Sequence, residues 1–118
     1  MDPVALPPGE GEQLGNHRVL AELPEYEAIL LSYDTDFEGV DPHTHDDHVD
    51  AFFVLEGEVE FFVEGEWIRG GPGTFVAAPP GVEHGFTKRD EGTARFLNIH
   101  APNVGFIARL RERYQAPR

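Results

Sequence analysis

The 118-residue chain contains no cysteine, which excludes disulfide bonds and thiolate metal ligands. Any metal site must therefore use histidine, carboxylate, carbonyl or water ligands. The sequence also has no long apolar run, so no membrane span or membrane partner is expected. Residues 1–4 lack the basic and apolar regions of a signal peptide, and a cytoplasmic location is expected.

Basic residues are scarce: Lys and Arg number 9 against 22 Asp and Glu, and the formal net charge is -13. Such a surface repels phosphate backbones, and no basic stripe interrupts it, so nucleic acid is not expected as a partner. The charge also disfavours a strongly anionic substrate, although a local pocket can override the global field.

Hydrophobic residues make up 40% of the chain, and nine of them are Phe, which indicates one folded domain. Short apolar segments alternate with Gly and Pro corners, a pattern typical of an all-β sandwich or small barrel. Strands are expected at residues 18–22, 26–33, 49–55, 59–63, 67–68, 74–78, around 86, and 93–100. Both faces of the 49–55 segment are apolar, which predicts a strand covered on both sides.

The chain divides into three expected parts: an extended arm at residues 1–16, a β-barrel at 17–102 and a C-terminal helix at 103–118. Pro102 ends the last strand, and Asn103 is a candidate N-cap for a helix that begins at about Val104. Its apolar face consists of Val104, Ile107, Leu110 and Tyr114. The helix is expected to cover the sheet and to leave its arginines in solvent.

One stretch, residues 43–50, holds a dense set of potential metal ligands. His43 and His45 are two apart, and so are His48 and Asp50, so on a strand each pair would share a face. Neutral imidazole is the commonest metal ligand, which favours a metal site. The alternative is a polar, acidic surface loop, and these residues alone leave both interpretations open.

A second motif lies downstream: Gly73, Pro79, Gly81 and His84. Together with His43-x-His45, an acid at position 50 and Gly57, it resembles the paired motifs of the cupin superfamily, and the chain resembles a small single-domain cupin of the conserved-barrel type. The resemblance implies a double-stranded β-helix, or jelly-roll barrel, followed here by a short C-terminal α-helix. It also implies a homodimer and one divalent metal ion, held by His43, His45, Asp50 and His84.

The sequence departs from the family pattern at three positions. Phe37 stands where a Gly is usual, with Gly39 close enough to serve the same bend, and Lys88 stands where an Asn often follows the last histidine. Asp50 replaces the usual Glu. Its side chain is shorter by one methylene, so we expect Asp50 to be a weaker ligand than the histidines, direct or water-bridged, and His48 is the alternative.

Three imidazoles and a carboxylate suit Fe, Mn, Ni, Cu or Zn rather than Ca or Mg. A six-coordinate ion would keep two positions open, an arrangement typical of catalysis. Candidates for an apolar wall are Phe52, Val54, Phe61, Phe75 and Phe86. These features predict an enzyme acting on a small apolar or aromatic substrate, a dioxygenase above all.

Other interpretations concern the function and two further histidines. The alternative function is a non-catalytic module that binds a metal or small molecule. A sugar isomerase or epimerase is less favoured because few polar groups are expected at the site. His17 is expected on the surface, and His100 is expected at the surface end of its strand rather than in the cavity as a proton carrier.

Overall fold

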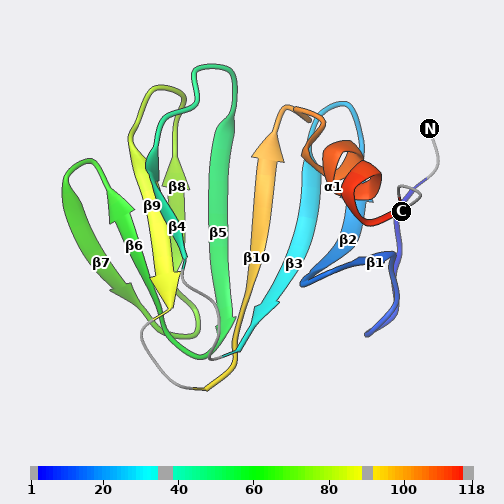
Figure 1. Cartoon of the computed structure of the whole chain (residues 1–118), viewed down its shortest axis with the longest axis horizontal. Helices are drawn as coiled ribbons and strands as arrows, with labels where there is room; N and C mark the ends of the chain where they lie inside the picture. The colour runs from blue at the N-terminus through cyan, green and yellow to red at the C-terminus, as the bar shows by residue number, and fades with distance from the viewer. Residues whose placement is uncertain (1–2, 35–38, 89–91, 116–118) are drawn as a thin grey trace.

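The computed structural model describes residues 3–34, 39–88 and 92–115, and it consists mainly of two antiparallel sheets (Figure 1). The six-stranded sheet has the order β1-β2-β3-β10-β5-β8. Its strands are β1 (Gln13–Leu14), β2 (His17–Glu22), β3 (Glu27–Tyr33), β10 (Ala94–Ala101), β5 (Val49–Glu56) and β8 (Phe75–Ala78). The four-stranded sheet contains β4 (Val40–His43), β9 (His84–Lys88), β6 (Val59–Val63) and β7 (Glu66–Gly70), in that order. The structure confirms the predicted all-β fold with a short terminal helix, α1 (Phe106–Gln115).

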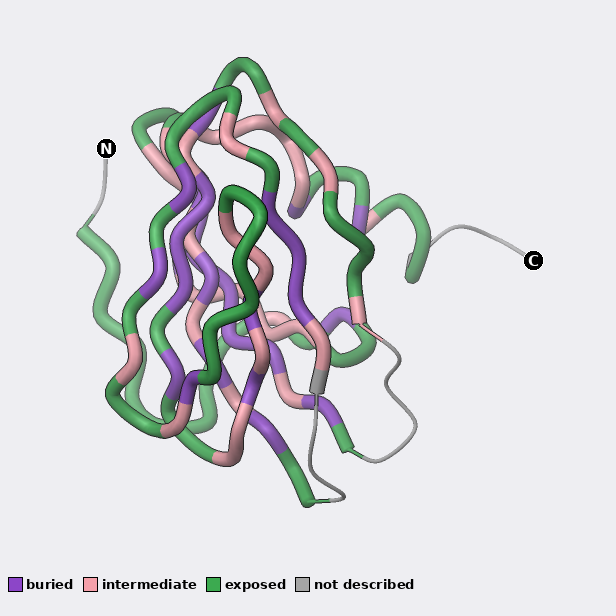
Figure 2. The backbone as a smooth tube through the Cα atoms, turned by 90° about the vertical axis from the view of Figure 1, so that its left-hand side faces the viewer, coloured by how far each residue is buried: buried purple, intermediate pink, exposed green. Residues whose placement is uncertain are grey.

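The core lies between the sheets and follows from strand alternation. In β10, Ala94, Phe96, Asn98 and His100 are buried while the residues between them are partly exposed. Phe52, Phe61, Phe86 and Phe96 meet in one aromatic cluster whose ring centroids lie 5.2 to 6.4 Å apart. Figure 2 shows the buried stretches running side by side along the strands. The cluster adjoins the histidines, because the ring centroids of Phe52 and His84 lie 6.5 Å apart.

Two glycines set corners beside strands of the site, one before β4 and one after β5. Gly39 precedes β4 with φ at +102°, and a Cβ there would lie 2.5 Å from the carbonyl oxygen of Phe86. Gly57 ends the β5 strand with φ at +77°, also in the left-handed region. Both positions require glycine because L side chains rarely adopt this conformation. Phe37, where the family pattern has its glycine, lies outside the described residues.

The expectation that the strand at 49–55 is covered on both sides is wrong for its outer face. Leu55 is 46% exposed, and Phe75, the cross-strand neighbour of Phe53 on β8, is 62% exposed. Sequence alternation identified the two faces of β5 correctly, but only the inner face meets the second sheet. The outer face therefore presents an apolar surface, which we call the β5–β8 face and define by Phe53, Leu55 and Phe75.

Helix α1 begins at Phe106, two residues later than predicted, and its N-terminus is held by a buried carboxylate. Glu27 at the start of β3 is 0% exposed and accepts hydrogen bonds from the backbone N–H groups of Val104, Phe106 and Ile107. A carboxylate at this end also complements the helix dipole. The expected cap, Asn103, instead accepts a hydrogen bond from the Gly105 N–H.

The N-terminal segment and α1 are tied to the sheet (Figure 1). Leu14 in β1 is buried and pairs with His17 in β2. Arg111, which the sequence placed in solvent, forms salt bridges with Glu12 and Glu22, both at 2.8 Å. The helix is thus fastened by its apolar face and by this pair of carboxylates. Among the described residues, no helix has the length and apolar character needed to cross a membrane.

Candidate metal centre

His43 and His84 face each other across two paired strands. His43 is the last residue of β4 and lies opposite His84, the first residue of β9, with ring centroids 4.6 Å apart. The Nδ1 atom of His43 lies 2.8 Å from the Asp41 carbonyl oxygen, and that of His84 lies 2.9 Å from the Val82 carbonyl oxygen. Because a carbonyl can only accept, each Nδ1 carries the proton. In a neutral ring this tautomer leaves Nε2 with a lone pair for a metal ion, and on His84 the ion would replace the proton that Nε2 donates to Asp50 in the metal-free protein.

His45 joins this pair from a loop. The shared face expected for His43 and His45 assumed one continuous strand, but β4 ends at His43. The backbone of His45 is instead fixed by the second motif, because the Gly81 N–H donates a 2.6 Å hydrogen bond to the His45 carbonyl. The His45 ring centroid lies 4.5 Å from that of His43 and 5.2 Å from that of His84. The loop brings the three rings together as strand geometry would not.

Asp50 lies on β5 and faces the histidines from the other sheet. Its Oδ2 atom is 2.9 Å from His84 Nε2 and 3.9 Å from His45 Nε2. Its Oδ1 atom accepts a 2.6 Å hydrogen bond from the Asn98 amide, which also donates to the Ala51 carbonyl oxygen. Asn98 therefore fixes the orientation of this carboxylate.

Electrostatics keep Asp50 ionised. Burial alone would raise the pKa of Asp50, but the hydrogen bond from His84, the nearby His100 and the Asn98 amide outweigh it and lower that pKa. Burial lowers the pKa of His84, yet its contact with Asp50 outweighs this and raises the pKa above its ordinary value. The pKa of His45 is lowered by burial and then by the neighbouring histidines. The centre thus combines an anionic carboxylate with imidazoles that differ in basicity.

Potential ligand atoms of His43, His45, Asp50 and His84 all lie within 4.8 Å of one another. The structure therefore brings together the four residues chosen from the sequence. Three imidazole nitrogens and one carboxylate oxygen fit a divalent d-block ion, and the histidines with backbone-anchored Nδ1 atoms present their Nε2 atoms to the same space. That Asp50 is a weaker ligand than the histidines, direct or water-bridged, stays a prediction.

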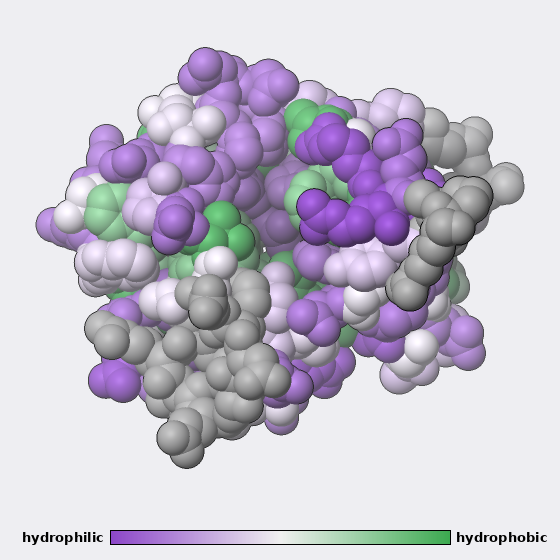
Figure 3. All heavy atoms as spheres, in the orientation of Figure 1, coloured by the Kyte–Doolittle hydropathy of each residue, from purple (hydrophilic) through white to green (hydrophobic). Residues whose placement is uncertain are grey.

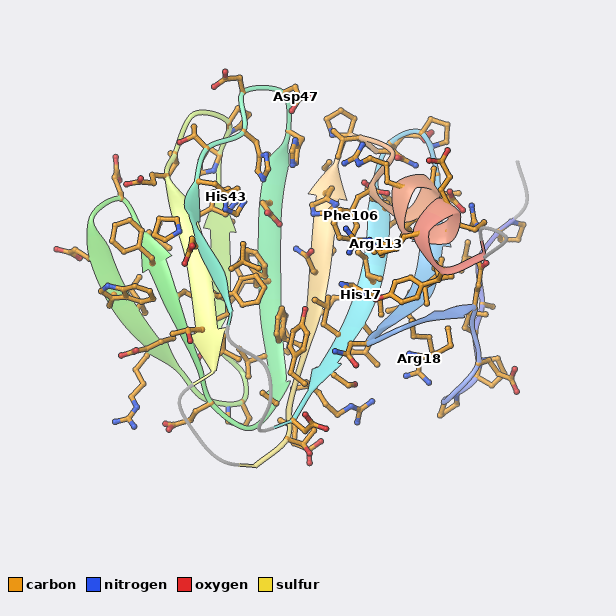
Figure 4. The ribbon with its side chains drawn as sticks, viewed as in Figure 1. His17, Arg18, His43, Asp47, Phe106 and Arg113 are labelled. Atoms are coloured by element: carbon orange, nitrogen blue, oxygen red, sulfur yellow. The ribbon has the colours of Figure 1, made fainter. Side chains whose placement is uncertain are left out.

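A cavity of about 320 Å³ adjoins these residues. Its apolar wall includes Leu31, Val40, Phe52, Phe86, Val104 and Phe106. Its polar lining includes three residues of the centre, His43, His45 and Asp50, together with His17, Tyr33, Asp47, His48, Asn98, His100 and Arg109. Figure 3, drawn in the orientation of Figure 1, shows a hollow in the middle of the molecule with hydrophobic side chains among hydrophilic ones. Figure 4 shows His43 on β4 and Phe106 at the start of α1. The polar lining is richer than the sequence suggested.

Several expectations about the lining were wrong. His100 is 5% exposed and lies in the cavity wall, because it shares the inward face of β10 with Phe96. His17 also lines the cavity, since β2 belongs to the same sheet, and its ring centroid lies 5.8 Å from that of Phe106. Phe75 points out to solvent and contributes nothing to the wall.

Three functional residues were missed or underrated. Asn98 and His100 alternate with Ala94 and Phe96, so the period of β10 could have placed both inward. Glu27 shares its face with Ile29 and Leu31, and a carboxylate at an inward position is itself a signal that it has buried partners. The contacts that these residues make span 47 to 80 positions in sequence, which no local pattern reveals.

Two facing antiparallel sheets around a histidine and carboxylate cluster define a small β-barrel protein with a candidate metal centre. The chain belongs to the cupin family, because the family model described as Cupin domain matches residues 33–100. The matched region contains all four residues of the centre.

A curated relative is the quercetin 2,3-dioxygenase of Bacillus subtilis (strain 168), 25% identical over 109 residues. The match covers 86% of this chain but spans only 32% of that protein's length. Among solved structures, KdgF from Halomonas sp. has a TM-score of 0.67 at 26% identity, covering 73% of this chain and 76% of KdgF. An RmlC-like cupin from Shewanella frigidimarina NCIMB 400 has a TM-score of 0.70 at 22% identity, covering 86% and 92% of the two chains, which shows the shared fold.

Proposed function

We propose that the protein is a mononuclear metal-dependent enzyme, a dioxygenase acting on a small molecule with an apolar or aromatic body. The observation that carries this proposal is the convergence of His43, His45, Asp50 and His84, of which the first three line a cavity that is partly walled by aromatic rings. The similarity to a quercetin 2,3-dioxygenase supports the same reaction class. We expect Fe, Mn, Ni, Cu or Zn at the centre.

The residues around the cavity would have three different roles in the proposed reaction. The three histidines would hold the ion through nitrogen, while Asp50 would balance its charge and accept a proton from a substrate hydroxyl at Oδ2. A bound Fe, Mn, Ni or Cu ion would supply Lewis acidity and redox chemistry with dioxygen, whereas Zn would supply Lewis acidity alone. Phe52, Phe86 and Phe106 would pack against the flat body of the substrate and keep bulk water away.

The cavity volume sets a bound on the substrate. At about 320 Å³ the cavity is at the small end of the range for ligand sites, roughly 300 to 1,000 Å³. A molecule with one or two fused rings and an adjacent pair of oxygen atoms would place those oxygens at the open metal positions. The polar lining would then bind its remaining hydroxyl groups.

The test is oxygen consumption by protein purified without chelator and analysed for metal. Flavonols, catechols and β-diketones are supplied one class at a time to the metal-loaded protein, to chelator-treated protein and to a metal-loaded His84→Ala variant. We expect oxygen uptake with at least one class in the first sample alone. Metal bound without uptake on any class would contradict the dioxygenase proposal and favour the non-catalytic binding module. Absence of bound metal even after loading would contradict the dioxygenase proposal and leave only a module that binds a small molecule.

A further inference from the structure

A second group of potential metal ligands adjoins the candidate centre. It consists of His48, Asp50 and His100, whose ligand atoms lie within 4.8 Å of one another, and all three residues are buried. His48 immediately precedes β5, and His100 on β10 is the register partner of Asp50. The two additional histidines lie outside the motif positions, yet they border the same cavity.

Both histidines are anchored by carboxylates on the side away from Asp50. His48 Nδ1 lies 2.7 Å from Asp47 Oδ1, and His100 Nδ1 lies 3.1 Å from Glu27 Oε2. An ionised carboxylate only accepts hydrogen bonds, so each Nδ1 carries the proton and each neutral ring keeps its lone pair on Nε2. This carboxylate–histidine arrangement is the usual way in which proteins orient a metal-binding imidazole.

The two oxygens of Asp50 serve the two groups separately. Oδ2 faces His84 and His45, as described above, whereas Oδ1 lies 3.5 Å from His100 Nε2. A lone pair on Nε2 and a carboxylate oxygen repel each other at this distance unless a cation lies between them. A proton on His100 would meet this need, and so would a metal ion, which would also engage His48.

We propose that His48 Nε2, His100 Nε2 and Asp50 Oδ1 bind a second divalent d-block ion, so that Asp50 bridges two ions. Two imidazoles and one carboxylate suit such an ion, and the cavity supplies water for a fourth position. The second ion binds more weakly than the first, because it has three protein ligands and is repelled by a cation close by. This inference goes beyond the mononuclear centre of the proposed function and shares Asp50 with it.

The test is a titration of chelator-treated protein with Zn²⁺, monitored by calorimetry. The bound metal is then measured after gel filtration. Wild type is expected to bind two equivalents, the second at least 10-fold more weakly than the first. His48→Gln and His100→Gln are expected to retain the first equivalent and lose the second. His17→Gln is the matched control, since it removes a cavity histidine outside both groups and is expected to keep both equivalents.

A second readout requires no variant. Mn²⁺ added at two equivalents to wild type is expected to give a spin-coupled electron paramagnetic resonance signal, because one carboxylate joins the two ions. A single saturable equivalent, or a spectrum of uncoupled ions, would overturn the proposal while leaving the mononuclear centre intact. If both Gln variants still bind two equivalents of metal, the second ion is adventitious and the proposal is likewise overturned. No binding at all would overturn the proposed function as well.

Discussion

Replacing Glu27 is the sharpest test of how α1 and the cavity wall are held. The Glu27 carboxylate accepts four hydrogen bonds, at 3.0 to 3.2 Å, from three backbone N–H groups at the start of α1 and from His100. The carboxylate is inaccessible to water in the folded protein, so solvent can replace it only in part when it is removed. Both the helix N-terminus and the His100 ring would then lose their partner.

The magnitude follows from the donors left behind. A buried donor without a partner costs about 1 to 3 kcal/mol, and the Ile107 N–H is the most deeply buried of the three backbone donors. Because the bonds from Val104 and Phe106 are only partly buried, water would satisfy part of their loss. We expect Glu27→Ala to lower the free energy of unfolding by about 3 to 5 kcal/mol, and Glu27→Gln by roughly 2 to 3 kcal/mol because one acceptor oxygen remains.

The assay is urea unfolding of metal-free protein at several pH values, with Glu25→Gln as the control. Glu25 is exposed in the turn that precedes β3 and is expected to change stability by no more than about 0.5 kcal/mol. Burial would raise the pKa of Glu27, but its hydrogen bonds outweigh this and lower the pKa. Its contribution is therefore present above its ordinary pKa of about 4.3 and is lost as pH falls through the folded value. A loss below 1 kcal/mol in Glu27→Ala would refute this account.

Three further predictions concern the metal, pH and assembly. His45→Ala is expected to lose most bound metal, whereas Asp50→Ala keeps most of it but alters turnover; metal analysis decides, and equal losses would make Asp50 a full ligand. In metal-free protein the pKa of His84 is raised on folding, so its protonation contributes stability that is present below about pH 6.5 and lost as pH rises through the folded pKa. The urea midpoints of wild type and His84→Gln should therefore converge towards high pH. A constant difference between the two midpoints would contradict this prediction. We propose a homodimer that covers the β5–β8 face, so Phe75→Glu is expected to give a monomer by light scattering at micromolar concentration, and a wild-type monomer would contradict the assembly.

The strands could be predicted from local signals, whereas the barrel and the four residues of the candidate site were implied by the resemblance of the two motifs to the cupin pattern. Alternation within β5, β6 and β10, together with Gly and Pro corners, is sufficient to predict the strands. The two motifs hold their residues at fixed spacing, because Gly81 must reach the His45 carbonyl for the loop and the turn to meet. The spacing of residues along the chain therefore predicts their arrangement in space only where a backbone contact such as this one requires that spacing.

The surrounding residues could not be predicted because their partners come from other strands. The prediction that His100 lies at a surface end of its strand is wrong, because that end of the strand is not exposed to solvent. Helix α1 and Glu27 cover it, so the end of β10 is interior and its polar side chains need partners. The strength of a buried network depends on every member being satisfied. The carboxylate that caps the helix therefore also orients His100 towards Asp50, and the stability of α1 and the geometry of the candidate centre depend on the same side chain.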